Sequence, residues 1–311
     1  MLQMLLLAFL CSNWLFLTAG DYTFGDARNR FQKTLLVVKH NFKSSPGPVL
    51  LHIRMWSKVF TNQLIFINWN DAEIANFTTN HLDVNGSISL VSKLEPRYPG
   101  FIAYEVVTLA MKSHPNYEGY LFAHDDMAMN ITALIGLDLQ SCWLSEWFSL
   151  NVCKNLDPLW NVTKNGWWWD SDYGTRAIDK MLANGNNTVI AREMKEVLGS
   201  NHHWCGEQSD FFYIPQTIRD VYIRVMGPFA DAGIFLEIAV PTFIRVYVPP
   251  EKYIKVPLCT MFNGHIRSNN SHIFQQMESR CGDKYPLYHP IKLSFKPNVA
   301  GMRKKMALLE D

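Results

Sequence analysis

Two adjacent carboxylates at the end of an apolar run are the residues of this chain best suited to do chemistry. Asp125 and Asp126 follow residues 120–123, which are aromatic or apolar and predict a buried strand. Carboxylates at the tip of a buried strand are costly unless something neutralises them. A divalent cation does so, because Mg²⁺ and Mn²⁺ prefer carboxylate oxygens and keep open positions for substrate phosphates. The pair therefore predicts a metal site for a phosphate-bearing ligand.

The same two residues have a second interpretation, in which they cap a helix. Asp is a favourable N-cap residue, and a helix that begins at Met127 would use the pair in this way. The two acids alone do not distinguish a metal site from a helix cap. The choice depends on features elsewhere in the chain.

Residues 120–129 resemble the Asp-x-Asp region of GT-A-fold nucleotide-sugar glycosyltransferases, with His124 where many members carry the first Asp. This departure leaves open which two side chains take the ligand roles. The resemblance implies that Asp125 and Asp126 hold Mn²⁺ or Mg²⁺, which bridges them to the diphosphate of a nucleotide-sugar donor. We also assign His124 and Lys39, the last residue of an earlier predicted strand, to donor binding.

His289 and Lys292 extend the resemblance to the other end of the chain. Several GT-A families complete the metal shell with a late His and place a Lys on the diphosphate shortly after it. The resemblance thus implies that His289 is a metal ligand and that Lys292 contacts the donor, roles that suit imidazole and ammonium groups. The alternative is an exposed polar loop, since single His and Lys residues are usually solvated.

Glu237 is the only charged residue in the apolar run 233–241. An isolated buried carboxylate is costly and often marks function, although it can also be a hydrogen-bonded core residue. Glycosyl transfer needs a base for the acceptor hydroxyl or a carboxylate that stabilises positive charge at the anomeric carbon. We therefore assign Glu237 as the catalytic carboxylate.

Aromatic rings and acids crowd together in residues 166–173, which include three consecutive Trp residues. Three neighbouring side chains cannot all face one way on a strand or a helix, so at least one ring is expected to be exposed. We assign Trp168 and Asp172 to acceptor binding as a platform for a sugar. Core packing under a loop is an equally good interpretation.

The elements around the acids alternate between strands and helices. Such alternation predicts a parallel sheet covered by helices, in which ligands bind beyond the carboxyl ends of the strands. Asp125 and Asp126 lie at such an end. The expected strands are 34–39, 63–69, 87–91, 120–124 and 209–215, and the expected helices are 49–60, 102–112, 175–182 and 216–225.

The resemblance implies an α/β, GT-A-like fold, with a Rossmann-type, mostly parallel sheet flanked by helices in a single large domain. We place this domain at residues 33–300, with a nucleotide-sugar half at 33–135 and an acceptor half at 136–300. Residues 21–32 are expected to be a short stem and 301–311 a C-terminal tail. The hydrophobic content of 48% fits a globular protein, and the net charge of +1 gives no electrostatic case for nucleic acid as a partner.

Two features predict entry into the secretory pathway. Residues 1–20 carry no charge, are about long enough to cross a bilayer and end in small residues, so they form a signal peptide or an uncleaved single-pass anchor. Six Asn-x-Ser/Thr sequons follow, as expected for a glycoprotein of the ER or Golgi lumen. In that oxidising compartment we expect the disulfides Cys142–Cys153 and Cys259–Cys281, which close short loops.

The function expected from these observations is metal-dependent transfer of a sugar from a nucleotide-diphosphate donor to a glycan or glycoprotein acceptor. One alternative is a secreted carbohydrate-binding protein that keeps the fold without turnover. A metal-dependent hydrolase is the other, but that class usually groups more acids and His residues around its metals, often two of them.

Overall fold

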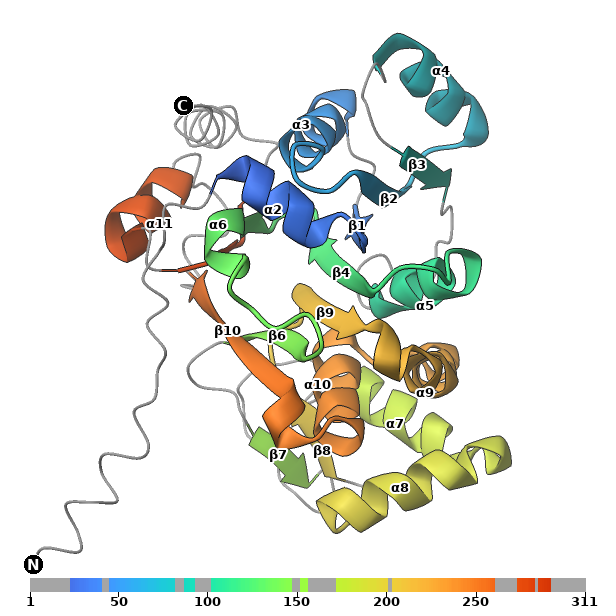
Figure 1. Ribbon diagram of the computed structural model, residues 1–311. Coiled ribbons are helices and arrows are strands. Elements are labelled where there is room, and N and C mark those ends of the chain that lie inside the picture. The colour runs from blue at the N-terminus through green and yellow to red at the C-terminus, as the bar shows by residue number, and fades with distance from the viewer. Residues whose placement is uncertain are drawn as a thin grey trace, which may run out of the picture.

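A nine-stranded mixed sheet forms the centre of the structure, which is a computed structural model of the chain (Figure 1). The structure describes residues 23–40, 45–81, 87–92, 102–146, 152–155, 172–200, 203–260, 273–282 and 285–291. The expected leader and C-terminal tail lie outside these ranges. Within them, each helix is too short or too polar to cross a bilayer.

Most neighbouring strands of the large sheet are parallel, in the order β3-β2-β1-β4-β9-β6-β10-β11-β5. The exceptions are β9, which is antiparallel to β4 and β6, and β5, which is antiparallel to β11. A separate antiparallel pair joins β7 to β8. The mostly parallel sheet predicted from the sequence is therefore confirmed. The bounds are β1 Thr34–Lys39, β2 Asn62–Ile67, β3 Ser87–Ser92, β4 Gly119–His124, β5 Ala128–Met129, β6 Cys142–Glu146, β7 Val152–Asn155, β8 His203–Gly206, β9 Phe211–Pro215, β10 Tyr253–Thr260 and β11 Leu287–His289.

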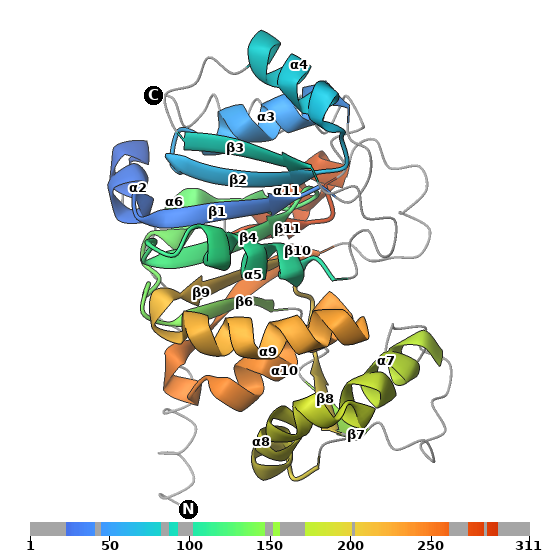
Figure 2. The same cartoon turned by 90° about the vertical axis from the view of Figure 1, so that its right-hand side faces the viewer.

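Helices cover both faces of this sheet, as Figure 2 shows. Along β1, Leu36 and Val38 face one apolar layer while Leu35 and Val37 face the other, so the strand is buried on both sides. The first layer contains α2 Phe24–Phe31, α3 Pro46–Trp56, α4 Asp71–His81, α6 Ile131–Leu134 and α11 Ile273–Cys281, and the second contains α5 Tyr104–Ser113, α7 Asp172–Ala183, α8 Thr188–Leu198, α9 Arg219–Ala232 and α10 Leu236–Tyr247.

The direction of the strands gathers several polar residues at one edge of the sheet. Lys39 and His124 end the parallel neighbours β1 and β4, and they are direct register partners. Asp210 immediately precedes β9, which runs the opposite way, so it reaches the same edge. His289 ends β11. The carboxyl edge of the parallel strands is therefore where these side chains can meet.

The structure overturns two sequence-based interpretations. The acids do not cap a helix at Met127, because a turn leads directly into β5 and α6 begins only at Ile131. Residues 24–31 of the expected stem form α2, whose Phe31 is fully buried against Phe60 and Trp143. Part of that segment is therefore packed into the domain core.

One of the two predicted disulfides is present and the other is not. Cys259 and Cys281 form the expected disulfide, which joins β10 to α11. The predicted Cys142–Cys153 bond is wrong, because Cys142 is a free thiol. Cys142 begins β6 and faces the apolar layer under the helices, where it packs as a small hydrophobic side chain. Cys205 is disulfide-bonded.

Aromatic stacking fixes the position of β9 beside β4 and β6. The ring centroids of Tyr213 and Trp143 are 4.4 Å apart, and the Tyr213 hydroxyl donates to the Leu139 carbonyl at 3.1 Å. The Tyr213 ring lies directly over Gly119, so a Cβ at that position would overlap it. Only glycine fits at the start of β4 while this ring keeps its place.

Gly119→Ala should therefore lower the free energy of unfolding by about 1–3 kcal/mol, as overpacking of a core does. Gly47→Ala is the matched control, because no atom lies within 4 Å of the added Cβ. It should leave stability unchanged or raise it by about 0.4–1 kcal/mol. Urea denaturation of both variants measures the difference. Equal midpoints would show that the Tyr213 ring can move aside.

Candidate functional site

Backbone hydrogen bonds from three other segments hold the turn that carries the acids. The Asp125 amide donates to the Lys39 carbonyl at 3.1 Å, and the His124 amide donates to the Asp210 carbonyl at 2.9 Å. The Asp126 carbonyl accepts from the Ile291 amide at 2.7 Å. The turn is thus tied to the ends of β1 and β11 and to the start of β9.

Asp126, Asp210 and His289 form one group at this edge. His289 Nε2 lies 3.2 Å from Asp126 Oδ1 and 3.6 Å from Asp210 Oδ2. One ligand atom from each of the three residues lies within 4.8 Å of the others. All three side chains are largely buried, with exposed fractions of 8%, 14% and 8%. The two carboxylates therefore sit close together with little water to screen them.

Gln208 contacts two members of this group. Its Nε2 contacts His289 Nδ1 and donates to Asp210 Oδ2 at 3.2 Å. The Gln208 carbonyl in turn accepts from the buried Ser145 hydroxyl at 2.6 Å. The orientations of the imidazole and of one carboxylate are thus fixed by the loop between β8 and β9.

The three residues fit a divalent cation. Carboxylate oxygens with one imidazole nitrogen are donors that Mn²⁺ accepts, whereas Mg²⁺ more strongly prefers oxygen alone. Donor atoms within 4.8 Å of one another can share an ion whose bonds are about 2 Å long. Two buried carboxylates and one imidazole leave an excess of negative charge, which a cation would offset.

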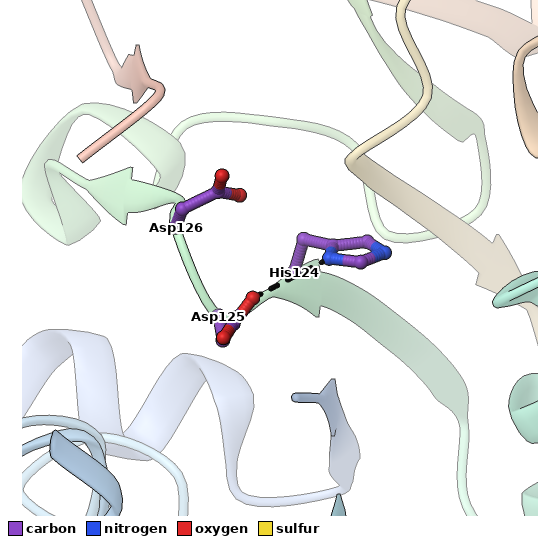
Figure 3. Close-up of side chains that lie close together, drawn as sticks. All are labelled: His124, Asp125 and Asp126. Atoms are coloured by element: carbon purple, nitrogen blue, oxygen red, sulfur yellow. Dashed lines mark ion pairs between the residues drawn. The ribbon is translucent and has the colours of Figure 1, made fainter. Parts of the chain in front are cut away.

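Asp125 points elsewhere, toward histidines. Its Oδ1 lies 3.6 Å from His124 Nδ1 and its Oδ2 lies 3.6 Å from His40 Nδ1. Figure 3 shows the Asp125 carboxylate in contact with His124, with the Asp126 carboxylate outside that contact. Burial alone would raise the pKa of Asp125, but the two imidazoles hold that pKa below its usual value. One ligand atom from each of His124, Asp125 and Asp126 also lies within 4.8 Å of the others, so the metal role predicted for Asp125 stays a prediction.

Glu237 lies in the first turn of α10, close enough to the group to respond to it. Burial, followed by the negative charge of Asp210, raises the pKa of Glu237 to about 7. His124 and His289 act in the opposite direction. The Glu237 carbonyl accepts from the Glu207 amide at 3.0 Å, which ties α10 to the loop that carries Asp210.

Of the four other residues assigned from the sequence, the structure describes Lys39 fully and Asp172 only in its backbone. Lys39 is buried at the end of β1, next to His124 in the adjacent strand. Asp172 is the first residue of α7, and its side chain lies outside the described part. Lys292 and Trp168 lie wholly outside the described residues.

Sequence reasoning missed Asp210, Gln208 and His40. Asp210 was seen only as the start of an expected strand at 209–215. A signal was available, because an acid that precedes a buried strand reaches the same edge as Asp126 if that strand is antiparallel. Single-sequence patterns do not give strand direction, so the residue was not singled out.

A pocket of about 400 Å³ opens at the same edge, beyond β2 and α4. Trp69, Phe77 and His81 form a line of rings on it, with centroids 5.0 Å and 4.9 Å apart. The rest of the lining comes from Glu73 and Asn76 of α4 and from Ser45 and Pro46 at the N-terminus of α3. In the sheet, β2, which leads to Trp69, is separated by β1 alone from β4, which leads to the acids.

No protein-family model matches the chain. A probable glycosyltransferase of Arabidopsis thaliana, STELLO1, is 22% identical to it over 193 residues. The match covers 61% of this chain and 23% of STELLO1, so the chain spans about a quarter of the length of that relative. The resemblance to glycosyltransferases expected from the motifs is therefore also found in an overall sequence comparison.

Solved structures with a GT-A-like fold resemble the chain loosely. The apo bifunctional glycosyltransferase WbbM has a TM-score of 0.44 and 9% identity, over 89% of this chain and 51% of that one. Glucosyl-3-phosphoglycerate synthase from Mycobacterium tuberculosis, in complex with phosphoglyceric acid, has a TM-score of 0.35 and 11% identity, over 76% and 75%. A glycosyltransferase involved in glycosylation of the major capsid of PBCV-1 has a TM-score of 0.38 and 11% identity, over 87% and 99%.

Mn²⁺ binding tests the group directly. For the wild type, Mn²⁺ at about 100 times its Kd should raise the free energy of unfolding by about 2.7 kcal/mol. Asp126→Asn and Asp210→Asn should each lose this gain, because each removes one charged donor. Asp220→Asn is the control, since Asp220 pairs with Arg219 on the surface, and it should keep the gain. A full gain in the Asp210 variant would remove Asp210 from the site.

Proposed function

We propose that the chain is a metal-dependent glycosyltransferase that uses a nucleotide-diphosphate sugar. The proposal rests chiefly on the convergence of Asp126, Asp210 and His289 at the carboxyl edge of a mostly parallel sheet. Ligands bind at this edge in open α/β sheets, and the donor set suits Mn²⁺. The sequence similarity to STELLO1 supports the same class of reaction.

The pocket beyond β2 is suited to the nucleoside of the donor. Aromatic rings provide a flat surface on which a base can stack, and the exposed ring on this pocket is His81, which packs on the buried Phe77 and Trp69 behind it. The pocket opens beyond β2, two strand positions from β4 in the sheet. We infer that the nucleoside lies at β2, that the diphosphate crosses the end of β1, and that the sugar reaches the end of β4.

The ends of β1 and β4 would then receive the diphosphate. Lys39 lies on that path and brings a positive charge, and Lys292 remains our further donor contact. Asp126, Asp210 and His289 would hold Mn²⁺ or Mg²⁺, which when bound would offset the charge of the diphosphate as it leaves. We also keep His124 as a donor-binding residue, because it is the register partner of Lys39 and contacts Asp125.

Glu237 would act on the other side of the sugar. Its carboxylate is buried at the start of α10, and its Oε2 makes no hydrogen bond in the described part of the chain. Either role expected for it, base toward the acceptor hydroxyl or stabiliser of the anomeric carbon, requires the ionised form. The acceptor would be a glycan or glycoprotein that approaches over Trp168 and Asp172, in the ER or Golgi lumen.

Turnover without an acceptor tests the proposed reaction. The purified chain, incubated with Mn²⁺ and a panel of UDP- and GDP-sugars, should slowly release the nucleotide from at least one donor. Release should stop when Mn²⁺ is chelated and should be absent in Asp126→Ala. If the wild type binds glycans but neither binds nor consumes any nucleotide-sugar, the alternative of a non-catalytic carbohydrate-binding protein is correct.

The raised pKa of Glu237 predicts that turnover depends on pH. With a pKa of about 7, the carboxylate is ionised above that pH and becomes protonated below it, so turnover should fall as pH decreases through 7. A bound cation would lower this pKa and move the acidic limb to lower pH. Glu237→Gln should reduce kcat at least about 100-fold and leave the affinity for the donor near that of wild type.

The control for this variant is its own Mn²⁺-dependent stabilisation, which should equal that of wild type. A variant that keeps both normal turnover and the acidic limb would assign Glu237 to the core alone.

A further inference from the structure

A second cavity, of about 460 Å³, lies between α10 and the start of β10, and the proposed reaction does not use it. Strand β6 and residues 205–207 at the end of β8 complete its walls. In the part of the chain that the structure describes, Asp126, Asp210 and His289 are not among its lining residues. Its volume lies within the range of about 300–1,000 Å³ that is typical of small-molecule sites. We call it the α10 cavity.

One face of α10 forms an apolar wall of this cavity. Pro241, Ile244 and Val248 recur at the spacing of three and four residues that places side chains on one side of a helix. Leu144 of β6 lines the same cavity, and all four side chains are buried. The wall therefore offers apolar atoms against which the C–H groups of a ring can pack.

This wall is tied to residues 205–207 by hydrogen bonds. Pro241 has no N–H, so it cannot make the helical bond to the Glu237 carbonyl, which accepts instead from the Glu207 amide at 3.0 Å. The Thr242 hydroxyl accepts from the Cys205 amide at 2.9 Å and donates to the Cys205 carbonyl at 3.3 Å. The two sides of the cavity are thus held in place within the fold, as expected of a preformed binding site.

Polar groups of both signs surround the apolar wall. Glu207, which is 2% exposed, brings a carboxylate, and the exposed Arg245 brings a guanidinium group. Lys255 is half-buried, and its Nζ pairs with Glu146 Oε1 at 3.0 Å. Burial raises the pKa of Tyr253, and the negative charges of Glu207 and Glu146 raise it further, so this phenol lies close to both carboxylates and keeps its proton. The cavity therefore carries donors and acceptors with little net charge.

This combination favours a neutral ligand that bears several hydroxyl groups. An anion would be repelled by Glu207, and a cation would be repelled by Arg245 and Lys255. A purely apolar ligand would cover charged groups without replacing their hydrogen bonds to water. A hydroxyl group can donate to a carboxylate and accept from a guanidinium or ammonium group, so it suits both signs of charge. A sugar ring combines such hydroxyl groups with apolar C–H faces.

We propose that the α10 cavity is a binding site for a neutral sugar ring, separate from the group formed by Asp126, Asp210 and His289. One C–H face of the sugar packs on the apolar wall of α10, and its hydroxyl groups donate to Glu207 and accept from Arg245. Tyr253 adds an aromatic ring to the same site. This binding needs neither metal nor nucleotide, so it does not rest on the proposed function.

Saturation-transfer NMR of the full chain, without metal or nucleotide, tests the ligand class. The probes are the methyl glycosides of glucose, galactose, mannose, N-acetylglucosamine and xylose. At least one should receive saturation, most strongly at the C–H protons of one ring face. Cyclohexanol is the matched ligand control, because it has a ring of similar size with a single hydroxyl, and it should bind more weakly. The proposal is overturned if no glycoside binds, or if cyclohexanol binds as tightly as the best glycoside.

Variants of the lining residues test the location. Glu207→Gln should weaken the Kd for the bound glycoside about tenfold, because hydrogen bonds to a charged group are stronger than those to a neutral one. Val248→Phe places a ring in the cavity and should abolish binding. Val197→Phe is the matched control, since it makes the same change at a residue of α8 that is 51% exposed, and it should bind as wild type does. Wild-type affinity in both lining variants would place the sugar elsewhere and overturn the proposal.

The metal group provides an independent check that Val248→Phe is folded and that the two sites are separate. This variant should keep the Mn²⁺-dependent stabilisation and the nucleotide release of wild type, because Val248 lines only the α10 cavity. Loss of nucleotide release in a variant that still binds Mn²⁺ would show that the cavity is part of the reaction site and overturn the separation. If the wild type binds no Mn²⁺, the proposed function fails, while glycoside binding and the urea midpoint of Val248→Phe still decide the sugar site.

Discussion

The repulsion between buried carboxylates at one edge of the sheet is the constraint on which the site depends. Asp126 and Asp210 both approach His289, and all three side chains are largely shielded from water. Like charges at this separation in a medium of low polarity destabilise the fold unless a cation lies between them. This buried cluster is therefore the observation on which the proposed metal site rests.

The topology brings these charges together from distant parts of the chain. Asp126 follows β4, Asp210 precedes the antiparallel β9, and His289 ends β11. The antiparallel insertion of β9 between β4 and β6 is essential, because a parallel strand in that place would carry Asp210 to the opposite edge. The stacking of Tyr213 on Trp143, with Gly119 beneath, fixes β9 in this position. A packing contact in the core thus determines the geometry of the site.

The sequence predicts the first half of the fold better than the second. Strands β1, β2 and β4 are continuous apolar runs, so their positions follow from composition alone. Strands β6 and β10 were not predicted, because β6 is a short run bounded by polar residues and β10 mixes Lys255 and Pro257 with apolar residues. Asp126 and His289, assigned from motifs, lie 3.2 Å apart, whereas Asp210 and His40 depend on pairings that a single sequence does not reveal.

The different surroundings of Asp125 and Asp126 are also visible only in the structure. In the sequence Asp125 and Asp126 are equivalent, and both were assigned to the metal. In three dimensions Asp125 faces His40 and His124, while Asp126 faces His289. Neighbouring side chains in this turn therefore meet different partners, a difference that the sequence does not show.

Anomalous diffraction at the manganese edge, from crystals of the chain grown with Mn²⁺, tests the central claim most directly. The account predicts a single strong peak at this edge of the sheet, at about 2–2.3 Å from a carboxylate oxygen of Asp126, a carboxylate oxygen of Asp210 and Nε2 of His289. A peak held by Asp125 and His124, with Asp210 and His289 more than about 4 Å away, would contradict it. So would the absence of any peak at Mn²⁺ concentrations that stabilise the protein.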